Sequence, residues 1–581
     1  MSINNKRIRT LLRFIVVLGL VALFMAVAYT GLGKPKAGID DANIFLVYGR
    51  NLAQGHGFVY NIGGERVEGF SSILWVLIIA GVSLLTGRPE TWLMILNAVI
   101  IAAALTVLTG WLDERAGPAV PGRDRGGRWL TLPSRLTWIW VFAVPGYLCW
   151  TTHTLMETGL WSALLICASV ITLDVFETGR FSKWRRAHMA GLIPALILTR
   201  PDGMAWGVIF LLLWFFAALA ETDRFRAAFG RVAPPLAAFV LTLSALFIFR
   251  LSVFGYPFPN TYYAKISPDK LYNLTTGLIY FLRFFASNGL IPILSLAAGA
   301  GLLLLIRFLI HPKGSQLNSF LRKNGAYVAI SFILFIGMSI PIVTGGDHFS
   351  QSRFFQPFWP LLVVPAFFVF GYARDLVQWR PPLASWLKRW KTWLLIPVFS
   401  LVAFGNSLPW YRLDGSGLAF EFRIAEIGRQ TGRFLNRLFE TARRPAVGDV
   451  VVGGIKYTYE GVIVDLMGLN NIRMAHSPGS RKGYKNHAAF DTDVFFEQRP
   501  DLIVPKLIAP EVRTNIIDNP WYEGLLRGLL HDERFVVLYE PVAIRRIDAA
   551  DPERLFAYFR KDYLSELRRS GRYEISVLDG R

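Results

Sequence analysis

The stretch Gly38–Ser72, GIDDANIFLVYGRNLAQGHGFVYNIGGERVEGFSS, decides how the rest of the chain is interpreted. It directly follows the first long apolar run and is more polar than a simple connection between two membrane spans needs to be. The adjacent carboxylates Asp40 and Asp41 precede an amphipathic run, and glycine-rich turns and Glu68 come after it. We therefore interpret this stretch as a loop that carries chemistry at a membrane surface.

The composition indicates a polytopic membrane protein. Of the 581 residues 53% are hydrophobic, and apolar runs near the ~17–25 residues that cross a bilayer recur up to about residue 410. The net charge of +21 comes largely from short Lys and Arg clusters between apolar runs, as in cytoplasmic connections. The chain has no long basic tract with interleaved aromatic residues, the pattern that would indicate a nucleic-acid partner. Cys149 and Cys167 lie inside apolar runs and are expected to be core residues rather than a disulfide.

The apolar runs predict about eleven membrane spans. Basic residues before the first span place its start in the cytoplasm and the Asp40–Asp41 loop outside. The predicted spans are Leu11–Gly31, Thr91–Trp111, Leu136–Thr151, Leu155–Val175, His188–Thr199, Met204–Ala220, Val232–Val253, Leu290–Ile310, Tyr327–Val343, Phe355–Tyr372 and Trp393–Leu408. The apolar run Ile73–Leu85 is short for a crossing, and a crossing there would place the arginine-rich segment Leu112–Arg135 outside. We expect it to be a juxtamembrane or re-entrant helix.

The fold class predicted is thus a polytopic α-helical membrane protein with a C-terminal external α/β domain. Residues 1–410 would form the membrane module and residues 411–581, which contain no spanning run, the external domain. The predicted strands are Asp449–Gly453, Gly461–Leu466, Leu502–Pro505, Phe535–Tyr539 and Val542–Ile547. The predicted helices of this domain include Phe420–Arg443 and Pro552–Arg569.

Four more polar motifs fall on the external face in this topology. They are Thr151–Thr158, Thr199–Gly203, Phe254–Lys265 and Gly345–Arg353. Charge at membrane depth is costly unless it lines a cavity or is neutralised, so these groups are functional candidates. Each motif also has a structural alternative: Arg-Pro can end a helix, His153 can satisfy a backbone group, and Gly-Gly-Asp-His can be a turn. The occurrence of all of them on one face favours function.

The motifs resemble the GT-C membrane glycosyltransferases, in the branch of the terminal β-(1→2) arabinofuranosyltransferases. The first loop is similar to that family's D-D-A-Y…V-E-G-x-[ST] loop over about thirty positions. Further similar motifs are Thr154–Thr158, Arg200–Gly203, Phe254–Lys265, Gly345–Phe354, Val464–Asn470 with its D-L-M-G-L sequence, and Lys485-x-His487. The resemblance implies a GT-C fold with juxtamembrane helices and transfer of a sugar, D-arabinofuranose, from a polyprenyl-phosphate donor.

The resemblance also implies roles for particular residues. The catalytic candidates are Asp40, Asp41 and Glu157. The donor- or phosphate-binding candidates are Arg200, Lys265, His348 and Arg353. The substrate-binding candidates are Glu68, His153, Asp202, Asn260, Tyr263, Asp347, Lys485 and His487. A carboxylate can take the proton of the acceptor hydroxyl and stabilise an oxocarbenium-like transition state, and cations can bind the leaving phosphate. No cofactor is certain from the sequence, and a divalent cation is left open.

The expected partners are the lipid bilayer, the polyprenyl-phosphate sugar donor, and a glycan or glycoprotein acceptor outside the cytoplasm. The expected location is the bacterial inner membrane, with the N-terminus cytoplasmic and the C-terminal domain periplasmic. Two alternatives stay open. Either Asp40 or Asp41 can be the N-cap of a helix Ala42–Gln54 rather than the base. The chain can also be interpreted as a secondary transporter of an envelope precursor, because buried charges and interrupted helices occur in both classes.

Overall fold

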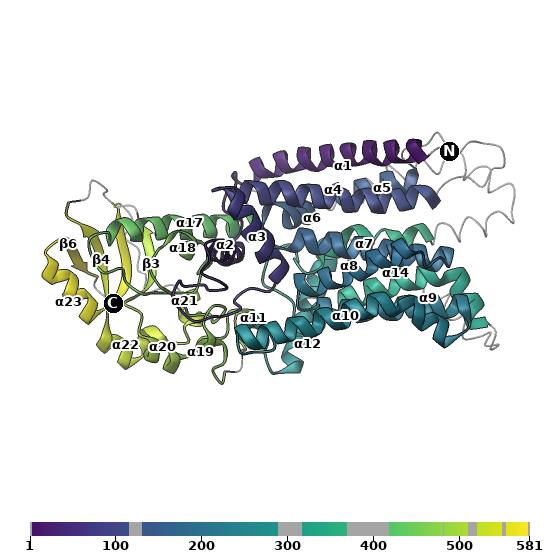
Figure 1. The fold of residues 1–581 in the computed structure, drawn as a ribbon. Coiled ribbons are helices and arrows are strands. Elements are labelled where there is room, and N and C mark those ends of the chain that lie inside the picture. The colour runs from purple at the N-terminus through teal and green to yellow at the C-terminus, as the bar shows by residue number, and fades with distance from the viewer. Residues whose placement is uncertain are drawn as a thin grey trace. The chain divides into compact units, whose positions relative to one another are not determined.

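The computed structural model describes residues 3–115, 131–143, 145–288, 316–368, 417–479, 481–508, 520–548 and 553–578. The chain forms two compact units (Figure 1). Unit 1 comprises Met1–Lys34, Thr91–Phe247 and Leu274–Ala419, and unit 2 comprises Pro35–Glu90, Ile248–Asn273 and Phe420–Arg581. The first polar loop and the C-terminal residues therefore belong to one compact unit. The division of the chain into domains at residue 410 stays a prediction.

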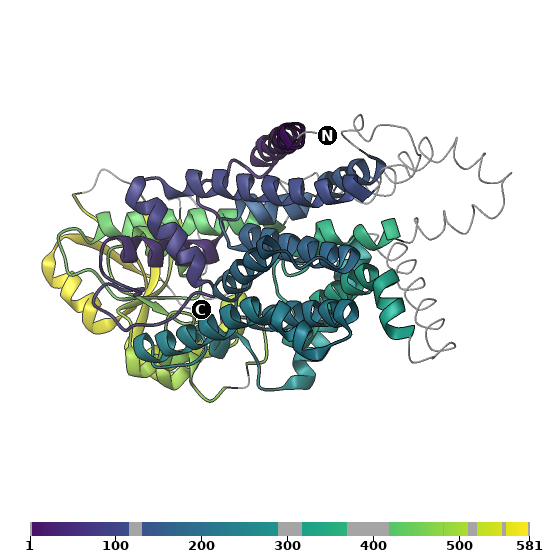
Figure 2. The same cartoon turned by 45° about the vertical axis from the view of Figure 1, so that its right-hand side comes forward.

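Unit 1 is helical. All or part of these elements belong to it: α1 (Ile3–Gly31), α4 (Pro89–Arg115), α5 (Leu132–Ala143), α6 (Pro145–Leu148), the π-helix η1 (Cys149–His153), α7 (Thr158–Thr178), α8 (Lys183–Thr199), α9 (Gly203–Thr222), α10 (Phe225–Val253), α12 (Lys270–Asn288), α14 (Gln316–Thr344) and the 3₁₀ helix η2 (Gln356–Leu361). Helices α7, α8 and α9 lie side by side, and α14 packs on α7 and α9 (Figure 2). The amphipathic helix α12 was not predicted from the sequence.

Six helices among the described residues are long and apolar enough to span a membrane. They are Lys6–Gly31, Pro89–Arg115, Thr158–Thr178, Gly203–Thr222, Phe225–Val253 and Asn324–Thr344. The predicted count of about eleven is not confirmed. The predicted spans Leu290–Ile310 and Trp393–Leu408 lie outside the described residues. The predicted non-crossing run Ile73–Leu85 is a helix of 13 residues, α3.

Three other predicted spans are not among the six for local reasons. The predicted span Leu136–Thr151 is divided between α5, α6 and the π-helix η1. The described part of the predicted span Phe355–Tyr372 is the shorter apolar helix Gln356–Phe368, which begins in the 3₁₀ helix η2, where Pro357 and Pro360 lack the N–H groups that a regular α-helix uses; residues 369–372 lie outside the described residues. The span His188–Thr199 belongs to α8, whose first turn is basic and which has only 17 residues.

A tryptophan pair joins two of the interrupted segments of unit 1. The rings of Trp140 in α5 and Trp359 in η2 are stacked, with centroids 4.5 Å apart and an interplanar angle of 5°. Each indole N–H donates to the other residue's backbone carbonyl, over 2.8 and 3.0 Å. Because a buried indole needs a hydrogen-bond acceptor, this reciprocal pairing allows two large aromatic side chains to pack in the core.

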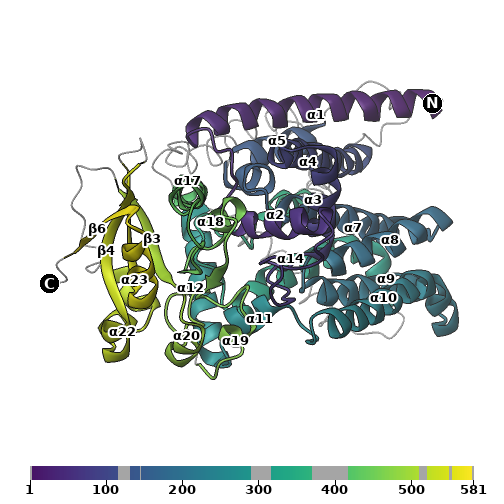
Figure 3. The ribbon, with the colours of Figure 1, turned by 60° about the vertical axis from the view of Figure 1, so that its left-hand side comes forward.

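Unit 2 combines a mixed sheet with short helices (Figure 3). Its elements are α2 (Asp40–Ala53), α3 (Ile73–Leu85), α11 (Asn260–Lys265), α17 (Gly417–Leu438), β1 (Val447–Asp449), α18 (Gly453–Thr458), β2 (Ile463–Asp465), α19 (Ile472–Ala475), α20 (Thr492–Gln498), β3 (Leu502–Ile508), α21 (Pro520–Leu525), η5 (Leu529–His531), α22 (Glu533–Leu538), β4 (Tyr539–Arg546), β5 (Arg554–Arg560), α23 (Lys561–Ser570) and β6 (Tyr573–Val577). The strand order is β2-β1-β3-β5-β4-β6.

The two halves of this sheet differ in direction. Strand β1 pairs parallel with β2 and β3, with Asp449 opposite Asp465, whereas β3, β5, β4 and β6 pair antiparallel. The carboxyl ends of parallel strands are the usual place for a site in a sheet of this kind. Here these ends lead into α18 and into the loop Asp465–Asn470.

The C-terminal secondary structure corrects part of the sequence prediction. The predicted helix Phe420–Arg443 is confirmed as α17, and β2, β3 and β4 overlap three predicted strands, whereas the predicted strand Asp449–Gly453 shares only Asp449 with β1 and ends where α18 begins. The predicted strand Phe535–Tyr539 is wrong: residues to Leu538 form α22, in which Phe535 is buried and the next two valines are exposed. The predicted helix Pro552–Arg569 is wrong in its first half, where β5 alternates partly between buried and less buried side chains. Strand β6 was not predicted.

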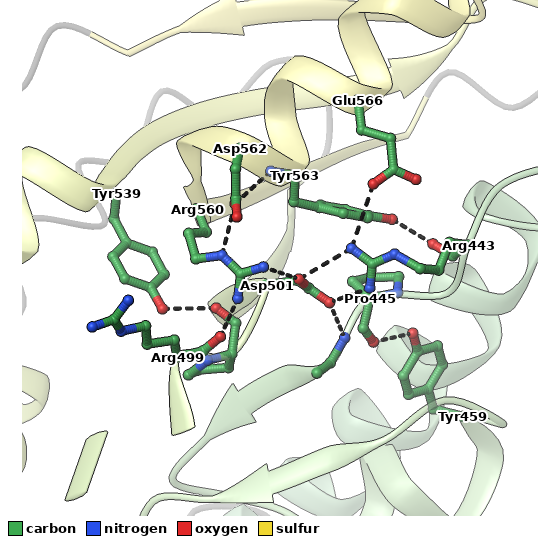
Figure 4. A network of polar contacts seen from close by, with 12 residues as sticks. Arg443, Pro445, Tyr459, Arg499, Asp501, Tyr539, Arg560, Asp562, Tyr563 and Glu566 are labelled. Atoms are coloured by element: carbon green, nitrogen blue, oxygen red, sulfur yellow. Dashed lines mark hydrogen bonds and ion pairs between the residues drawn. The ribbon is translucent and has the colours of Figure 1, made fainter. Parts of the chain in front are cut away.

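A carboxylate between two arginines joins the strands to the segment that precedes β1. Asp501 Oδ2 accepts from Arg443 Nη1 at 2.7 Å and from the backbone N–H of Ala446 at 2.8 Å, and Oδ1 accepts from Arg560 Nη2 at 2.9 Å (Figure 4). The Asp501 side chain is 5% exposed, so its charge depends on these partners. Tyr563 also donates to the Arg443 carbonyl, over 2.6 Å.

Candidate active site

Asp40 fastens the start of α2 to α18. Its Oδ2 accepts from the backbone N–H of Gly453 at 2.9 Å, and its Oδ1 accepts from that of Gly454 at 2.7 Å. A Cβ on Gly453 would lie 1.9 Å from the Asp40 carbonyl oxygen, so only glycine permits this approach. The expected capping role is therefore corrected: the N-cap of α2 is Ile39, without a side-chain bond, and Asp40 binds the N-terminus of another helix.

The environment of Asp40 shifts the pKa of its carboxyl group towards neutral pH. Burial raises the pKa of Asp40 to about 7, against the opposing effect of the Gly454 and Gly453 N–H groups. The negative charges of Asp41 and Asp449 raise it further. A carboxyl pKa near 7 matches proton transfer at physiological pH.

Asp41 lies beside a cation supplied by α11. Its Oδ2 is 3.6 Å from the Nζ of Lys265, and the two side chains are 22% and 23% exposed. Since Lys265 ends the P-N-T-Y-Y-A-K motif, the structure brings together two motifs that are more than two hundred positions apart. Asp41 and Lys265 are thus a partly exposed acid–base pair that a substrate can reach. Asp40 is less accessible, because both of its carboxylate oxygens accept hydrogen bonds from α18.

Glu68, a predicted substrate-binding residue, is paired instead with a buried arginine. Arg250 donates to it twice, from Nε to Oε2 and from Nη2 to Oε1, both at 2.9 Å. The two residues are 2% and 3% exposed. Burial raises the pKa of Glu68 and Arg250 opposes this. The arrangement is a bidentate buried ion pair, which positions the loop and leaves little surface for a substrate.

The loop Asp465–Asn470 connects the first loop to α11. Tyr48 donates to Asn470 Oδ1 at 3.1 Å, and the backbone N–H of Gly69 donates to the Tyr48 hydroxyl at 3.2 Å. The predicted substrate ligand Asn260 donates from its side chain to the carbonyls of Gly468 and Leu469, at 2.7 and 3.0 Å. Asn260 therefore holds this loop in place.

The first loop also completes the edge of the sheet. The side chain of Asn61 donates to the Ile463 carbonyl at 2.9 Å and accepts from the Ile463 N–H at 3.1 Å, as a neighbouring strand would. The hydroxyl of Tyr60 donates to the Val452 carbonyl at 2.7 Å. The stretch that the sequence singles out thus contacts the first residue of β2 and the segment that follows β1.

Tyr263 and the pair Lys485 and His487 lie toward the loop that follows α19. The ring of Tyr263 packs on His476, with centroids 4.2 Å apart. The Nζ of Lys485 is 5.7 Å from the centroid of the Tyr272 ring, and His487 Nδ1 lies 3.2 Å from the Lys485 carbonyl. These residues share unit 2 with Asp41.

In unit 1, Glu157, Arg200 and Asp202 form a second cluster. Arg200 Nη1 donates to Glu157 Oε1 and Arg200 Nε donates to Asp202 Oδ1, both at 2.9 Å. The side chain of Glu157 is 2% exposed and its Oε2 has no hydrogen-bond partner. The guanidinium of Arg200 also lies 5.2 Å from the Phe354 ring. The motifs M-E-T and R-P-D-G are therefore one structural site.

Asp347, His348 and Arg353 meet in the strained loop that follows α14. Arg353 Nη2 is 2.6 Å from Asp347 Oδ2, and His348 Nδ1 is 3.2 Å from Asp347 Oδ1. The guanidinium of Arg353 lies 5.0 Å from the centroid of the Phe354 ring, which Arg200 also contacts. Four residues of this loop have left-handed backbones: Gly345, Gly346, Gln351 and Ser352. Left-handed non-glycine residues are energetically costly and are often found at functional sites.

His153 is placed by two hydrogen bonds within unit 1. Its Nε2 is 3.2 Å from the Met25 carbonyl and its Nδ1 is 2.8 Å from the Thr152 hydroxyl. The residue is 2% exposed. This environment is the structural alternative that the sequence left open for His153, in which the ring satisfies a backbone carbonyl.

Metal binding was left open by the sequence. Within the described ranges, no three His, Cys, Asp or Glu side chains come together in a group suited to a metal ion. The catalytic candidate Glu157 is ion-paired with Arg200.

Solved structures with a similar fold are known. The fold of this chain is similar to that of ArnT from Cupriavidus metallidurans, crystallised with undecaprenyl phosphate, with a TM-score of 0.50, 13% identity, and coverage of 94% of this chain and 97% of that one. The archaeal oligosaccharyltransferase AglB from Archaeoglobus fulgidus gives a TM-score of 0.47 at 12% identity, covering 95% of this chain and 74% of that one. No family model and no curated protein matches the sequence. The chain has a GT-C-type fold.

Several residues of these clusters were not singled out from the sequence. Arg250 lies in an apolar run, where a charged residue is itself a signal of a buried partner. Tyr48, Asn61 and Asn470 carry no such signal, because their partners lie in distant parts of the chain. The N–H groups of Gly453 and Gly454 belong to the backbone and have no side-chain signature.

Proposed function

We propose that this chain is a membrane glycosyltransferase that transfers a sugar, D-arabinofuranose, from a polyprenyl-phosphate donor to an acceptor outside the cytoplasm. The observation that carries the proposal is the pairing of Asp41 with Lys265, because it places a base and a phosphate-binding cation together on the two motifs that the GT-C resemblance singles out. The likeness to ArnT, a protein crystallised with undecaprenyl phosphate, supports a lipid-phosphate donor.

Asp41 is the general base in this proposal. The acceptor hydroxyl oxygen attacks the anomeric carbon, the bond between that carbon and the phosphate oxygen breaks, and the electron pair leaves with the phosphate. Asp41 takes the hydroxyl proton as the new bond forms, and until that transfer is complete its carboxylate charge stabilises the oxocarbenium-like transition state. The partial exposure of Asp41 supports this assignment over Asp40.

Asp40 is a positioning residue. Its hydrogen bonds to Gly453 and Gly454 hold the start of α2, and with it Asp41, against α18. The pair Glu68–Arg250 and the Tyr48–Asn470 contact support the same loop from its other end. A base held within a few tenths of an ångström of its working position is the condition for efficient proton transfer.

The leaving phosphate needs cations. Lys265 is the cation next to the base, and a phosphate oxygen can replace the Asp41 carboxylate at its loose 3.6 Å contact. Arg200, His348 and Arg353 keep the donor-binding role that the resemblance implies. Their carboxylate partners Glu157, Asp202 and Asp347 orient them in this proposal. Guanidinium groups fixed in this way bind phosphate oxygens in a bidentate manner.

The location follows from the same proposal. The protein would lie in the bacterial inner membrane with its N-terminus in the cytoplasm, so that the first loop and the sheet face the periplasm. The basic connectors between apolar runs support this orientation.

The test is a transfer assay on the purified full-length protein with polyprenyl-phosphoryl-arabinofuranose and glycan extracted from the envelope. We expect a new glycosidic bond and release of polyprenyl phosphate with the wild-type chain, and almost none with Asp41→Asn. Incorporation into vesicles separates the alternative: movement of labelled donor across the bilayer without bond formation would establish a transporter and overturn the proposal.

A further inference from the structure

A buried arginine, one of whose guanidinium nitrogens makes no hydrogen bond, follows α19. Arg481 is 7% exposed and has a left-handed backbone, with φ +51°. Its Nη2 donates to the carbonyls of Ala475 and Ser477 at 2.7 and 2.8 Å, and its Nε donates to the Tyr263 carbonyl at 3.2 Å. The remaining nitrogen, Nη1, is buried and has no hydrogen-bond partner. Buried guanidinium donors are normally satisfied, so this one points to a missing acceptor.

A second arginine reaches the same place. Arg527, which follows α21, donates from Nη2 to the Ala488 carbonyl at 2.7 Å. A Cβ built on Gly479 would lie 2.5 Å from Arg481 Nη1 and 3.7 Å from Arg527 Nη1. Arg481 Nη1 therefore occupies the place that a side chain at Gly479 would need, and Arg527 Nη1 lies on the same side of this glycine.

The positive charges of the two arginines beside Gly479 are not neutralised by an ion pair within the described residues. Neither Arg481 nor Arg527 is within salt-bridge distance of a carboxylate in the part of the chain that the structure describes. Burial and the neighbouring Arg527 lower the pKa of Arg481, while Asp491 raises it. The Oδ1 of Asp491 is already occupied as the N-cap of α20, where it accepts from the N–H groups of Asp493 and Val494.

An aromatic stack lies next to this pair. The ring of His476 contacts both Tyr256 and Tyr263, with centroids 4.3 and 4.2 Å away, and the two tyrosine rings contact each other, with centroids 5.9 Å apart. His476 Nε2 is a second buried polar atom without a partner. The same residue Tyr263 accepts from Arg481, so the stack and the arginines are one structure. Helix α11, which carries Tyr263, packs on α19 (Figure 3).

We propose that Arg481 and Arg527 bind one oxyanion, a phosphate or a carboxylate, on the acceptor, with the His476–tyrosine stack beside it. The two arginines form a guanidinium pair suited to the oxygens of such a group. Aromatic rings next to it suit the apolar face of the sugar that carries the charge. The acceptor would thus be an acidic glycan. The identification of the ligand as the acceptor rests on the proposed function, whereas the oxyanion site itself rests on the positions of the two arginines.

The experiment is a binding titration by calorimetry at constant ionic strength, with the full-length protein in detergent. The probes are methyl phosphate, methyl glucuronide and, as the neutral control, methyl glucoside. The variant is Arg527→Gln, which removes an exposed side chain, and the matched control is Arg473→Gln, which removes an exposed arginine from neighbouring α19. We expect saturable binding of at least one anionic probe to the wild type and to Arg473→Gln, and none of the glucoside.

In Arg527→Gln the affinity should fall roughly 10- to 100-fold, the usual effect of losing one charge-assisted hydrogen bond. The stronger of the two anionic probes identifies the oxyanion. Equal weakening in both variants, or no saturable binding to the wild type, would overturn the inference. Binding that persists in a preparation without transfer activity would refute the proposed function and leave the oxyanion site in place.

Discussion

The carboxylate of Asp40 lies 2.9 Å from the backbone nitrogen of Gly453, although 413 positions separate the two residues in the chain. This contact, with the parallel one to Gly454, makes the first loop and α18 parts of one structure. Its neighbour Asp41 pairs with Lys265 on α11. The two adjacent carboxylates are therefore expected to respond differently to the same substitution.

Asp41→Asn should lower the transfer rate ~10²–10⁴-fold, because the amide cannot accept the acceptor's proton. Its melting temperature and its donor KM should stay close to those of the wild type. Asp40→Asn should instead lower the free energy of unfolding by about 1–3 kcal/mol, since an amide has only one acceptor atom for two N–H groups. Transfer kinetics and thermal unfolding of both variants test this. Full activity in both would remove the first-loop carboxylates from the mechanism.

The stability of the wild type relative to Asp40→Asn should depend on pH. The pKa of Asp40 is about 7 in the folded chain against 3.8 for an unperturbed group. The folded state thus binds this proton more tightly, and the contribution to stability is lost as the pH rises from about 4 through about 7. The difference in unfolding free energy between wild type and variant should therefore shrink from pH 5 to pH 8. A difference that grows would mean that the two N–H groups hold the pKa low.

Gly69→Ala should separate the first loop from the loop Asp465–Asn470. A Cβ there would lie 2.0 Å from the Asn470 side-chain oxygen and 2.8 Å from the Tyr48 hydroxyl. We expect a loss of about 1–3 kcal/mol, the cost of overpacking a tight contact, measured by thermal unfolding. The control is Gly524→Ala in α21, where no atom lies within 4 Å of the added carbon. Equal effects of both changes would show that the contact at Gly69 is not specific.

Arg200→Lys and Arg353→Lys should raise the donor KM roughly 10- to 100-fold with a smaller change in kcat. Lysine keeps the charge that Glu157 and Asp347 need but loses the planar fork that binds phosphate oxygens. Replacement by alanine would leave buried carboxylates unpaired and confuse stability with binding. Steady-state kinetics with the purified donor check the prediction, and unchanged KM values would exclude both residues from donor binding.

Asp501→Asn should destabilise the C-terminal sheet by about 2–4 kcal/mol, because the charge between Arg443 and Arg560 is lost at a buried position. Thermal unfolding of the full chain measures this. Arg433→Gln, which breaks an exposed ion pair on α17, serves as the control and should leave the melting temperature unchanged. A variant at Asp501 as stable as the wild type would show that the network in Figure 4 contributes nothing.

Local sequence patterns predicted much of the fold. The amphipathic run after Asp41 predicted α2, six of the eleven predicted apolar spans coincide with helices of spanning length, and the predicted helix Phe420–Arg443 corresponds to α17. Where a short apolar sequence fits two structures, the pattern failed. Residues Phe535–Leu538 are apolar enough for a strand, but Asp532 caps them as a helix.

The clusters could be predicted only in part, for a similar reason. Arg200 and Glu157 were expected on one face, and their ion pair agrees with that expectation. The partner of Glu68 was not expected, since Arg250 is enclosed in an apolar run. Contacts such as that of Asn61 with β2 depend on tertiary structure alone. No local pattern predicts which distant backbone groups a side chain will meet.

The order of synthesis adds a consequence to the Asp40–Gly453 contact. At ~5–20 residues per second, a ribosome needs on the order of 20–80 s to add the 413 positions between them. During that time the buried face of α2, with Tyr48 and Val47, has no sheet to pack against. The nascent chain must therefore carry this loop in a protected, unfinished form until the last quarter of the polypeptide has emerged, and a truncated product that stops before Gly453 would leave its first loop permanently open to proteases.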